Sequence, residues 1–258
     1  MSDFIAMLIL AAIQGISEWF PISSSGHLVL FSQLLNYNNT VSFDVALHFG
    51  TLMAVFVYFG KDIVDILEDI LKGKWKSDKA RLGWLLLLSS IPAAIIGYFF
   101  KKYFELAFES LAIVALGFAI TGILLLIASF DFKNEKKTPD WKDSLLIGLA
   151  QAFAIFPGVS RSGSTISAGL LRGLDSKEAM RFSFLMSIPV IFGAALLELG
   201  SEKLPTSYLL PMLVSFVIGL GTIHLLLKVV ANSKKNLRWF AFYVLVVAMG
   251  MGIWLLIK

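Results

Sequence analysis

The sequence predicts an all-α polytopic membrane protein, with six transmembrane helices and two re-entrant helical hairpins arranged as an inverted-topology repeat. Three observations support this fold class. Of the 258 residues, 57% are hydrophobic and only 16% are charged, and the mean hydropathy is +0.80, so lipid is the expected solvent. Six apolar stretches are long enough to cross a bilayer, and two more are interrupted by proline, glycine and serine. The basic residues gather in alternate loops.

The first element, residues 4–35, is apolar but contains Pro21 and a serine cluster at positions 23–25. Its length suits two half-helices joined by a turn, which together enter and leave the membrane on one side. Broken backbone at that depth is tolerated only where it is buried in protein or lines a wet cavity. The sequence therefore predicts a re-entrant hairpin here.

Three spans follow, at residues 43–60, 82–100 and 111–130. Each has close to the ~20 apolar residues that the hydrocarbon core requires. Residues 61–81, between the first two spans, form the longest polar loop, and their apolar residues recur at helical spacing. We expect an amphipathic segment at the membrane interface, without a catalytic duty.

The second half of the chain repeats this plan. Residues 143–172 form the second interrupted stretch, broken by Pro157 and Gly158, and are predicted to be the second re-entrant hairpin. Three more spans follow, at residues 180–199, 208–229 and 237–257.

The basic residues set the expected orientation. If the first hairpin enters from outside, most of the 22 lysines and arginines lie inside and both termini lie outside, as the positive-inside rule requires. The net charge of +4 then reflects topology and anionic lipid headgroups, and no nucleic-acid partner is expected. Because the chain has no cysteine, disulfides and thiol chemistry are excluded.

The two interrupted stretches are related to each other. One spacing, without a gap, pairs four sets of identical residues: Gln14 with Gln151, Ser23 with Ser160, Ser25 with Ser162, and Gly26 with Gly163. Three spans separate the stretches, and because this number is odd, the second copy enters from the opposite face. We therefore predict a single membrane domain, residues 1–258, made of two inverted repeats, residues 1–130 and 138–258.

The first hairpin concentrates polar chemistry in "QGISEWFPISSSGH". Gln14 and Glu18 are four residues apart and share one helix face. Pro21 is expected to end that helix, and Gly26 permits a close backbone approach in the turn that follows. A new half-helix is expected to begin near His27, where free N–H groups suit an anion.

The second hairpin carries "FPGVSRSGST". Its guanidinium, Arg161, is flanked by hydroxyls at a glycine-containing turn that opens a helix. This combination suits phosphate, because arginine gives bidentate charge-assisted hydrogen bonds and the hydroxyls and backbone N–H groups supply the rest. The candidate phosphate ligands here are Ser160, Arg161, Ser162 and Thr165, with Gly163 in support.

The polar residues of the two hairpins also have purely structural interpretations. Serines in membrane helices often bond their own backbone or join helices, and Glu18 and Arg161 would also serve as a plain ion pair. A buried charge nevertheless costs roughly 2.5–3.5 kcal/mol at the bilayer centre, which favours a functional role. His48 and His224 lie in ordinary spans, apart from the polar clusters, and are expected to be packing or headgroup residues.

Both motifs resemble those of the undecaprenyl-pyrophosphate phosphatase family, also called the bacitracin-resistance family. "QGISEWFPISSSGH" resembles its (E/Q)xxxE and PxSSxGH segments, and "PGVSRSGST" resembles its PGxSRSxxT signature. The resemblance covers nearly the whole chain. It implies hydrolysis of the C55 polyprenyl pyrophosphate carrier to the monophosphate and inorganic phosphate, on the outer face of the cell membrane. This reaction recycles the carrier for peptidoglycan and other envelope polymers.

The resemblance also implies roles for individual residues. The essential carboxylate falls on Glu18, the nucleophile on Ser24, the motif histidine on His27 and the phosphate-binding arginine on Arg161, with Ser160 and Thr165 beside it. Ser23 is a further candidate phosphate ligand in the first hairpin. The family uses a divalent cation, Mg²⁺ or Ca²⁺, for which Glu18 is the candidate ligand. Gln14 occupies the first acidic position of the motif, which leaves one carboxylate instead of two.

Several mechanisms remain open at this point. Ser24 would attack the terminal phosphorus, with Glu18 or His27 accepting its proton, and the alternatives are His27 as the nucleophile and direct attack by an activated water. A different class of function is a secondary transporter or flippase of an anion or a lipid phosphate, because inverted repeats with broken helices are typical of transporters. The expected partners are the polyprenyl pyrophosphate and membrane lipids, with a homodimer also considered.

Overall fold

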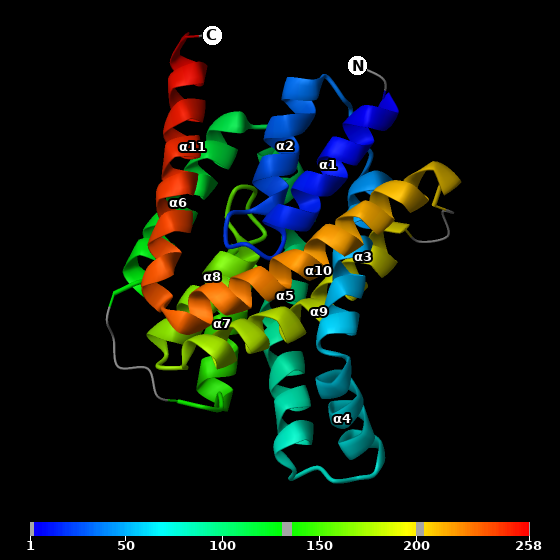
Figure 1. The fold of residues 1–258 in the computed structure, drawn as a ribbon, viewed down its shortest axis with the longest axis vertical. Coiled ribbons are helices and arrows are strands. Elements are labelled where there is room, and N and C mark those ends of the chain that lie inside the picture. The colour runs from blue at the N-terminus through cyan, green and yellow to red at the C-terminus, as the bar shows by residue number, and fades with distance from the viewer. Residues whose placement is uncertain (1–2, 131–135, 200–203, 258) are drawn as a thin grey trace.

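The computed structural model describes residues 3–130, 136–199 and 204–257. Every regular element in these ranges is helical (Figure 1). The α-helices are α1 (Asp3–Ser17), α2 (Ser24–Leu35), α3 (Val41–Tyr58), α4 (Gly60–Leu71), α5 (Asp78–Phe108), α6 (Leu111–Ala128), α7 (Trp141–Phe153), α8 (Arg161–Leu171), α9 (Ser176–Leu199), α10 (Leu209–Asn232) and α11 (Leu237–Ile257). Two short 3₁₀ helices, η1 (Thr206–Tyr208) and η2 (Lys234–Asn236), precede α10 and α11.

The six predicted spans are confirmed. Among the described residues, six helices are long and apolar enough to cross a bilayer: α3, α5, α6, α9, α10 and α11. The largest difference is α5, which has 31 residues and is about 46 Å long, because Ser77 caps it early and Pro92 does not end it. The chain is thus a multi-pass membrane protein.

The two interrupted stretches form helix pairs. α1 and α2 pack on each other across a break at residues 18–23, and α7 and α8 do so across a break at residues 154–160. The first break starts earlier than expected, because α1 ends at Ser17 and Pro21 lies within the break. α2 also begins at Ser24, before His27.

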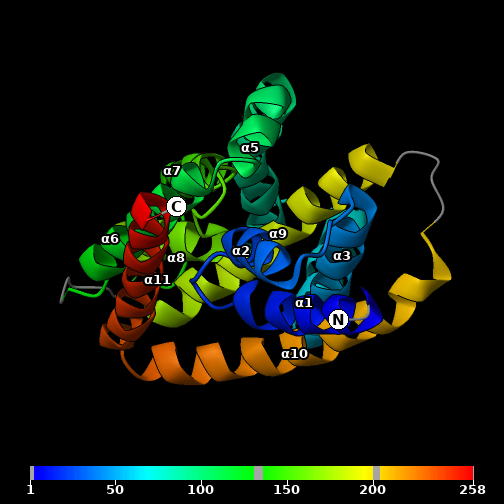
Figure 2. The same cartoon turned by 90° about the horizontal axis from the view of Figure 1, so that it is seen from above.

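Helices α1, α2 and α8 lie inside a ring of other helices, and α7 is part of that ring (Figure 2). Seen from above, α1 and α2 are central, with α10 on one side, α5 and α7 on the other, and α6 and α11 at one end. α1 packs on α10 and α7 packs on α5, while α6 and α11 pack on each other. This arrangement buries most of the first break and residues 157–160 of the second within the protein.

Small residues let these helices approach closely. A Cβ atom at Gly15 of α1 would lie 2.8 Å from Ile218 of α10, and one at Gly148 of α7 would lie 2.5 Å from the Ser89 carbonyl of α5. Helices in lipid associate chiefly through such close packing, because lipid tails are as apolar as the side chains. The close contacts of α1 with α10 and of α7 with α5 therefore fix the positions of the two breaks.

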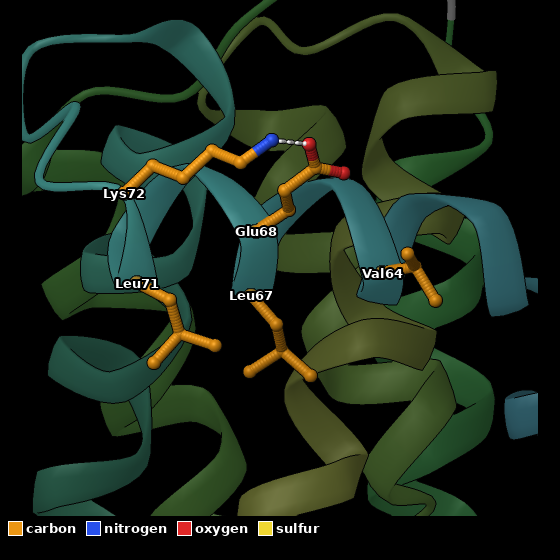
Figure 3. A pocket seen from close by; sticks show the side chains of 5 residues that line it. All are labelled: Val64, Leu67, Glu68, Leu71 and Lys72. Atoms are coloured by element: carbon orange, nitrogen blue, oxygen red, sulfur yellow. Dashed lines mark hydrogen bonds and ion pairs between the residues drawn. The ribbon is translucent and has the colours of Figure 1, made fainter.

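Helix α4 lies outside this ring, beside the first turns of α5 (Figure 1). Val64, Leu67 and Leu71 form an exposed apolar strip that lines a shallow surface pocket, with the Glu68–Lys72 ion pair at its edge (Figure 3). The helix is amphipathic, as the sequence predicts, and its place at the membrane interface remains a prediction. Its five pocket residues carry no convergent polar groups of the kind that bind a phosphate.

Candidate active site at the two helix breaks

The two breaks touch each other. A Cβ atom at Gly26 would lie 3.0 Å from the Cα atom of Gly158, and one at Gly163 would lie 3.4 Å from Pro21. The hydroxyl of Ser162 donates to the carbonyl of Phe20 at 3.2 Å, so the first turn of α8 also satisfies the backbone of the first break. The sequence places these segments far apart, and the fold brings them together.

Each break ends in the same helix cap. Ser23 accepts a hydrogen bond from the N–H of Gly26 at 3.3 Å, and Ser160 accepts one from the N–H of Gly163 at 3.0 Å. The repeat relates the two serines to each other, and likewise the two glycines. A serine at this position satisfies one of the free N–H groups of a helix N-terminus. Ser23 takes the cap with φ at 69°, a conformation that is uncommon for any residue but glycine.

Helix α6 supports the second break. The hydroxyl of Thr121 donates to the carbonyl of Gly158 at 3.0 Å and accepts from the N–H of Ser160 at 2.9 Å. Irregular backbone at membrane depth requires such partners, because an unpaired buried peptide group is costly. Gly158 itself has φ at +84°, and a Cβ atom there would overlap the carbonyl of Val114. Glycine is therefore required at this point of the turn.

A buried ion pair joins the breaks. Nη2 of Arg161, the first residue of α8, donates to Oε1 of Glu18, the first residue after α1, at 2.5 Å. The guanidinium also stacks on the ring of Trp19 at 5.2 Å from its centroid, and Nη1 reaches the Ser183 carbonyl at 3.4 Å. Two side chains, those of Glu18 and Trp19, and one backbone carbonyl, that of Ser183, thus hold the arginine in place.

The second oxygen of Glu18 collects two more donors. Oε2 accepts from the Ser24 hydroxyl at 2.6 Å and from Nε2 of Gln14 at 3.1 Å. The Ser24 contact is short, as expected for a hydroxyl on a carboxylate. Glu18 therefore lies between the predicted nucleophile and the predicted phosphate-binding arginine.

His48 of α3 reaches this cluster, contrary to our expectation of a packing or headgroup residue. Its Nε2 lies 3.5 Å from Oε2 of Glu18, while its Nδ1 bonds the carbonyl of Asp44 at 2.8 Å. A carbonyl only accepts, so Nδ1 carries the proton and Nε2 faces the carboxylate. His224 lies apart from this cluster in the described part of the chain, and its Nδ1 is 3.2 Å from the hydroxyl of Tyr58.

The side chain of His27 points away from Glu18 and toward α11. Its Nδ1 donates to the carbonyl of Ser23 at 2.7 Å, which leaves Nε2 to accept from the hydroxyl of Tyr243 in α11 at 2.8 Å. The ring also packs edge-on against Phe118 of α6. Among the described residues, its polar contacts are with α11 and with its own turn, and both ring nitrogens are occupied. Tyr243 is a neighbour that no motif in the sequence indicates.

The other predicted phosphate ligands are engaged within the protein. Ser23 and Ser160 cap helices, and their hydroxyls contact those of Ser25 and Ser162. Thr165 donates to the carbonyl of Arg161 at 2.8 Å and lies 2.6 Å from the Ser183 hydroxyl. These hydroxyls shape the turns, and their contact with phosphate remains a prediction.

The cluster is not completely covered by the protein. The Glu18 side chain is only 5% exposed, whereas that of Arg161 is 16% exposed and that of His48 is 30% exposed. Ser24 is also partly exposed. A ligand would thus reach the arginine and the serine before the carboxylate.

The donor set constrains any cation. The described residues contain no group of three or more His, Cys, Asp or Glu side chains suited to a metal ion. Glu18 is engaged at both oxygens, and Oε1 of Gln14 is a buried oxygen without a partner in the described part of the chain. Magnesium commonly uses one or two carboxylates together with substrate phosphates. The residues therefore fit a cation that shares its coordination with a bound phosphate.

Known proteins resemble this chain over nearly its full length. Residues 7–250 match the family described as bacitracin resistance protein BacA. An undecaprenyl-diphosphatase 1 of Pseudoalteromonas translucida is 40% identical over 265 residues, which cover 98% of this chain and 99% of that protein. Undecaprenyl-diphosphatases of Methanococcus vannielii and Korarchaeum cryptofilum are each 38% identical, covering 92% and 95% of this chain and 94% and 96% of theirs. The chain belongs to the bacitracin resistance protein BacA family.

Proposed function

We propose that this protein is an undecaprenyl-diphosphatase, which hydrolyses undecaprenyl pyrophosphate to the monophosphate and inorganic phosphate within the cell membrane. The single observation that carries the proposal is the Ser24–Glu18–Arg161 cluster, in which one carboxylate touches both a hydroxyl and a guanidinium. The curated relatives that share the chain's full length bear this name. The activity recycles the carrier lipid, and the family name connects it with bacitracin resistance.

Arg161 would recognise the terminal phosphate. Its guanidinium is fixed by Glu18 and Trp19 and lies at the N-terminus of α8, where backbone N–H groups add further positive potential. Phosphoryl transfer depends mainly on positioning and on neutralising charge at the equatorial oxygens. A preorganised arginine at a helix start supplies both.

Ser24 would be the nucleophile and Glu18 its base. The Ser24 hydroxyl already donates to Oε2 of Glu18, so its proton passes to the carboxylate as Oγ attacks the terminal phosphorus. The bond from that phosphorus to the bridging oxygen breaks, and the polyprenyl monophosphate leaves with the electron pair. Water then cleaves the phosphoserine, releasing inorganic phosphate and restoring the serine hydroxyl.

His27 would position this apparatus and not attack the phosphorus itself. Its two nitrogens bind the Ser23 carbonyl and the Tyr243 hydroxyl. Those bonds tie the start of α2, and hence Ser24, to α11. In this interpretation, the motif histidine maintains the geometry of the first turn.

A divalent cation, Mg²⁺ or Ca²⁺, would join the site with the substrate. Gln14 through Oε1 and Glu18 through its carboxylate are the protein groups that would hold it. A bound cation supplies neutralisation of charge on the diphosphate oxygens. The attack by Ser24, the proton transfer to Glu18 and the recognition of phosphate by Arg161 are carried out by side chains of the protein itself.

We also propose the membrane arrangement that the sequence predicts. In it, α1–α2 and α7–α8 are re-entrant hairpins of an inverted repeat, residues 1–130 and 138–258, with the site open to the outer face and both termini outside. The matched caps at Ser23 and Ser160 support the repeat. The prenyl chain of the substrate would lie in the lipid beside the spans.

Phosphate release in detergent micelles tests the function. Because micelles have no compartments, inorganic phosphate released there from a polyprenyl pyrophosphate comes from hydrolysis and not from transport. We expect turnover by the wild-type protein and a loss of at least ~10²-fold in Arg161→Lys, since lysine cannot reproduce the fork. Transport of a phosphate into liposomes, without release in micelles, would refute the proposal in favour of a transporter.

A further inference from the structure

The carboxylate of Glu18 already accepts three hydrogen bonds in the protein alone, one of them from a guanidinium, which weakens it as a ligand for a cation. Oε1 binds the guanidinium of Arg161 at 2.5 Å, and Oε2 accepts from Ser24 at 2.6 Å and from Gln14 at 3.1 Å. The ion pair also cancels the charge of the carboxylate. A divalent cation at the remaining lone pair of Oε1 would meet the positive charge of Arg161.

Gln14 is the residue that decides this balance. It is fully buried, and its Nε2 donates to Oε2 of Glu18 at 3.1 Å. Oε1 is buried and has no partner in the described residues. One neutral oxygen contributes little against the hydration of a divalent cation, which prefers six or more oxygen ligands in the case of Ca²⁺.

The remaining neighbours do not complete a site. His48 offers a nitrogen, which is a poor ligand for hard cations. Asp44, one turn earlier in α3, binds the side chain of Asn39 at 3.0 Å. The missing oxygens and negative charge must come from the ligand, and a diphosphate supplies both.

From these contacts, we propose that Gln14 sets the order of binding. The free protein holds no divalent cation, and the cation enters only as its complex with the diphosphate, completed by Oε1 of Gln14. This inference rests on the proposed function and adds to it the form of the substrate, a metal–diphosphate complex. A second carboxylate at position 14 would instead create a cation site in the protein alone.

The uptake of Mn²⁺, followed by the electron paramagnetic resonance signal of free Mn²⁺ in detergent, tests this inference. We expect wild-type protein to leave the signal unchanged beyond that of detergent micelles. Addition of a prenyl methylenediphosphonate, whose bridging carbon resists hydrolysis, should bring protein-bound Mn²⁺ in excess of that bound by the diphosphonate alone. Gln14→Glu should bind Mn²⁺ without the diphosphonate, at least tenfold more tightly than wild type.

Gln151→Glu is the matched control. It makes the same substitution at the repeat-related position, where residue 155 is isoleucine and no carboxylate lies one turn ahead. It should bind no more Mn²⁺ than wild type, whereas a gain equal to that of Gln14→Glu would overturn the role of the Gln14–Glu18 pair.

Stoichiometric uptake of Mn²⁺ by wild-type protein alone would overturn the inference, and this measurement does not depend on any variant folding. Failure of the proposed function has a different signature. It would appear as no phosphate release from a polyprenyl pyrophosphate in the same micelles, whatever Mn²⁺ uptake is observed.

Discussion

The Glu18–Arg161 pair allows a structural role to be separated from a catalytic one. Arg161→Met removes the cation and keeps an unbranched apolar stem, so it leaves the Glu18 carboxylate buried, with only 5% of its side chain exposed. Removing one partner of a buried pair costs about 3–5 kcal/mol. For a chain of this size, that corresponds to a fall in Tm of roughly 6–20 °C.

The double variant Glu18→Gln/Arg161→Met then isolates the two roles. It buries no charge, and a glutamine can still accept from Ser24 and Gln14, so we expect it to recover most of the lost Tm. It should remain inactive, because both the base and the phosphate ligand are gone. The loss of Arg161 alone should reduce phosphate release by at least ~10²–10³-fold.

The assays are thermal unfolding in detergent and phosphate release from a polyprenyl pyrophosphate, both measured on the same preparations. Lys72→Met is the control, since it breaks the Glu68–Lys72 pair, whose side chains are exposed, and it should leave Tm close to that of wild type. Near-normal turnover by the double variant would refute the catalytic assignment. A double variant no more stable than Arg161→Met would refute the charge argument.

Three further predictions follow from single contacts. Ser24→Ala should reduce the rate of phosphate release by at least roughly 10³-fold. Thr121→Val should lower Tm, because two backbone groups of residues 154–160 lose their partner, at roughly 1–3 kcal/mol each. The pKa of Asp140 is lowered from 3.8 to about 2, because Lys136 and the first N–H groups of α7 bond its carboxylate. Its stabilising contribution is therefore complete above pH ~4 and lost as pH falls through ~2, so Asp140→Asn should show a smaller fall in Tm between pH 5 and pH 3 than wild type.

Each of these has its own control. Turnover by Ser24→Ala within tenfold of wild type would assign the attack to water or to His27. Thr222→Val removes a hydroxyl that bonds only a carbonyl of its own helix, so its Tm should stay close to that of wild type. If it falls as far as Thr121→Val, the support of the second break is not the cause. An unchanged pH dependence in Asp140→Asn would mean that other carboxylates govern acid unfolding.

Hydropathy predicted much of the fold, because a bilayer imposes a length and an apolar composition on each span. The six spans and the two interrupted stretches follow from residues that are close in sequence. The pairing of Glu18 with Arg161 was considered only because the repeat related the two stretches, and because charges are costly in lipid. Helix ends were less well predicted, and α2 begins at Ser24 because the side chain of Ser23 caps it.

The sequence by itself determined which six segments are long and apolar enough to cross a membrane and which side chains are candidates for the chemistry, because both are recorded in local composition and motif. Only the tertiary structure decided how those side chains face one another. His48 joins Glu18 because α3 packs beside α1, and His27 turns away because Phe118 and Tyr243 fix its ring. Such orientations depend on helix rotation and crossing, which arise from contacts between residues far apart in the chain and leave no periodic signal within it.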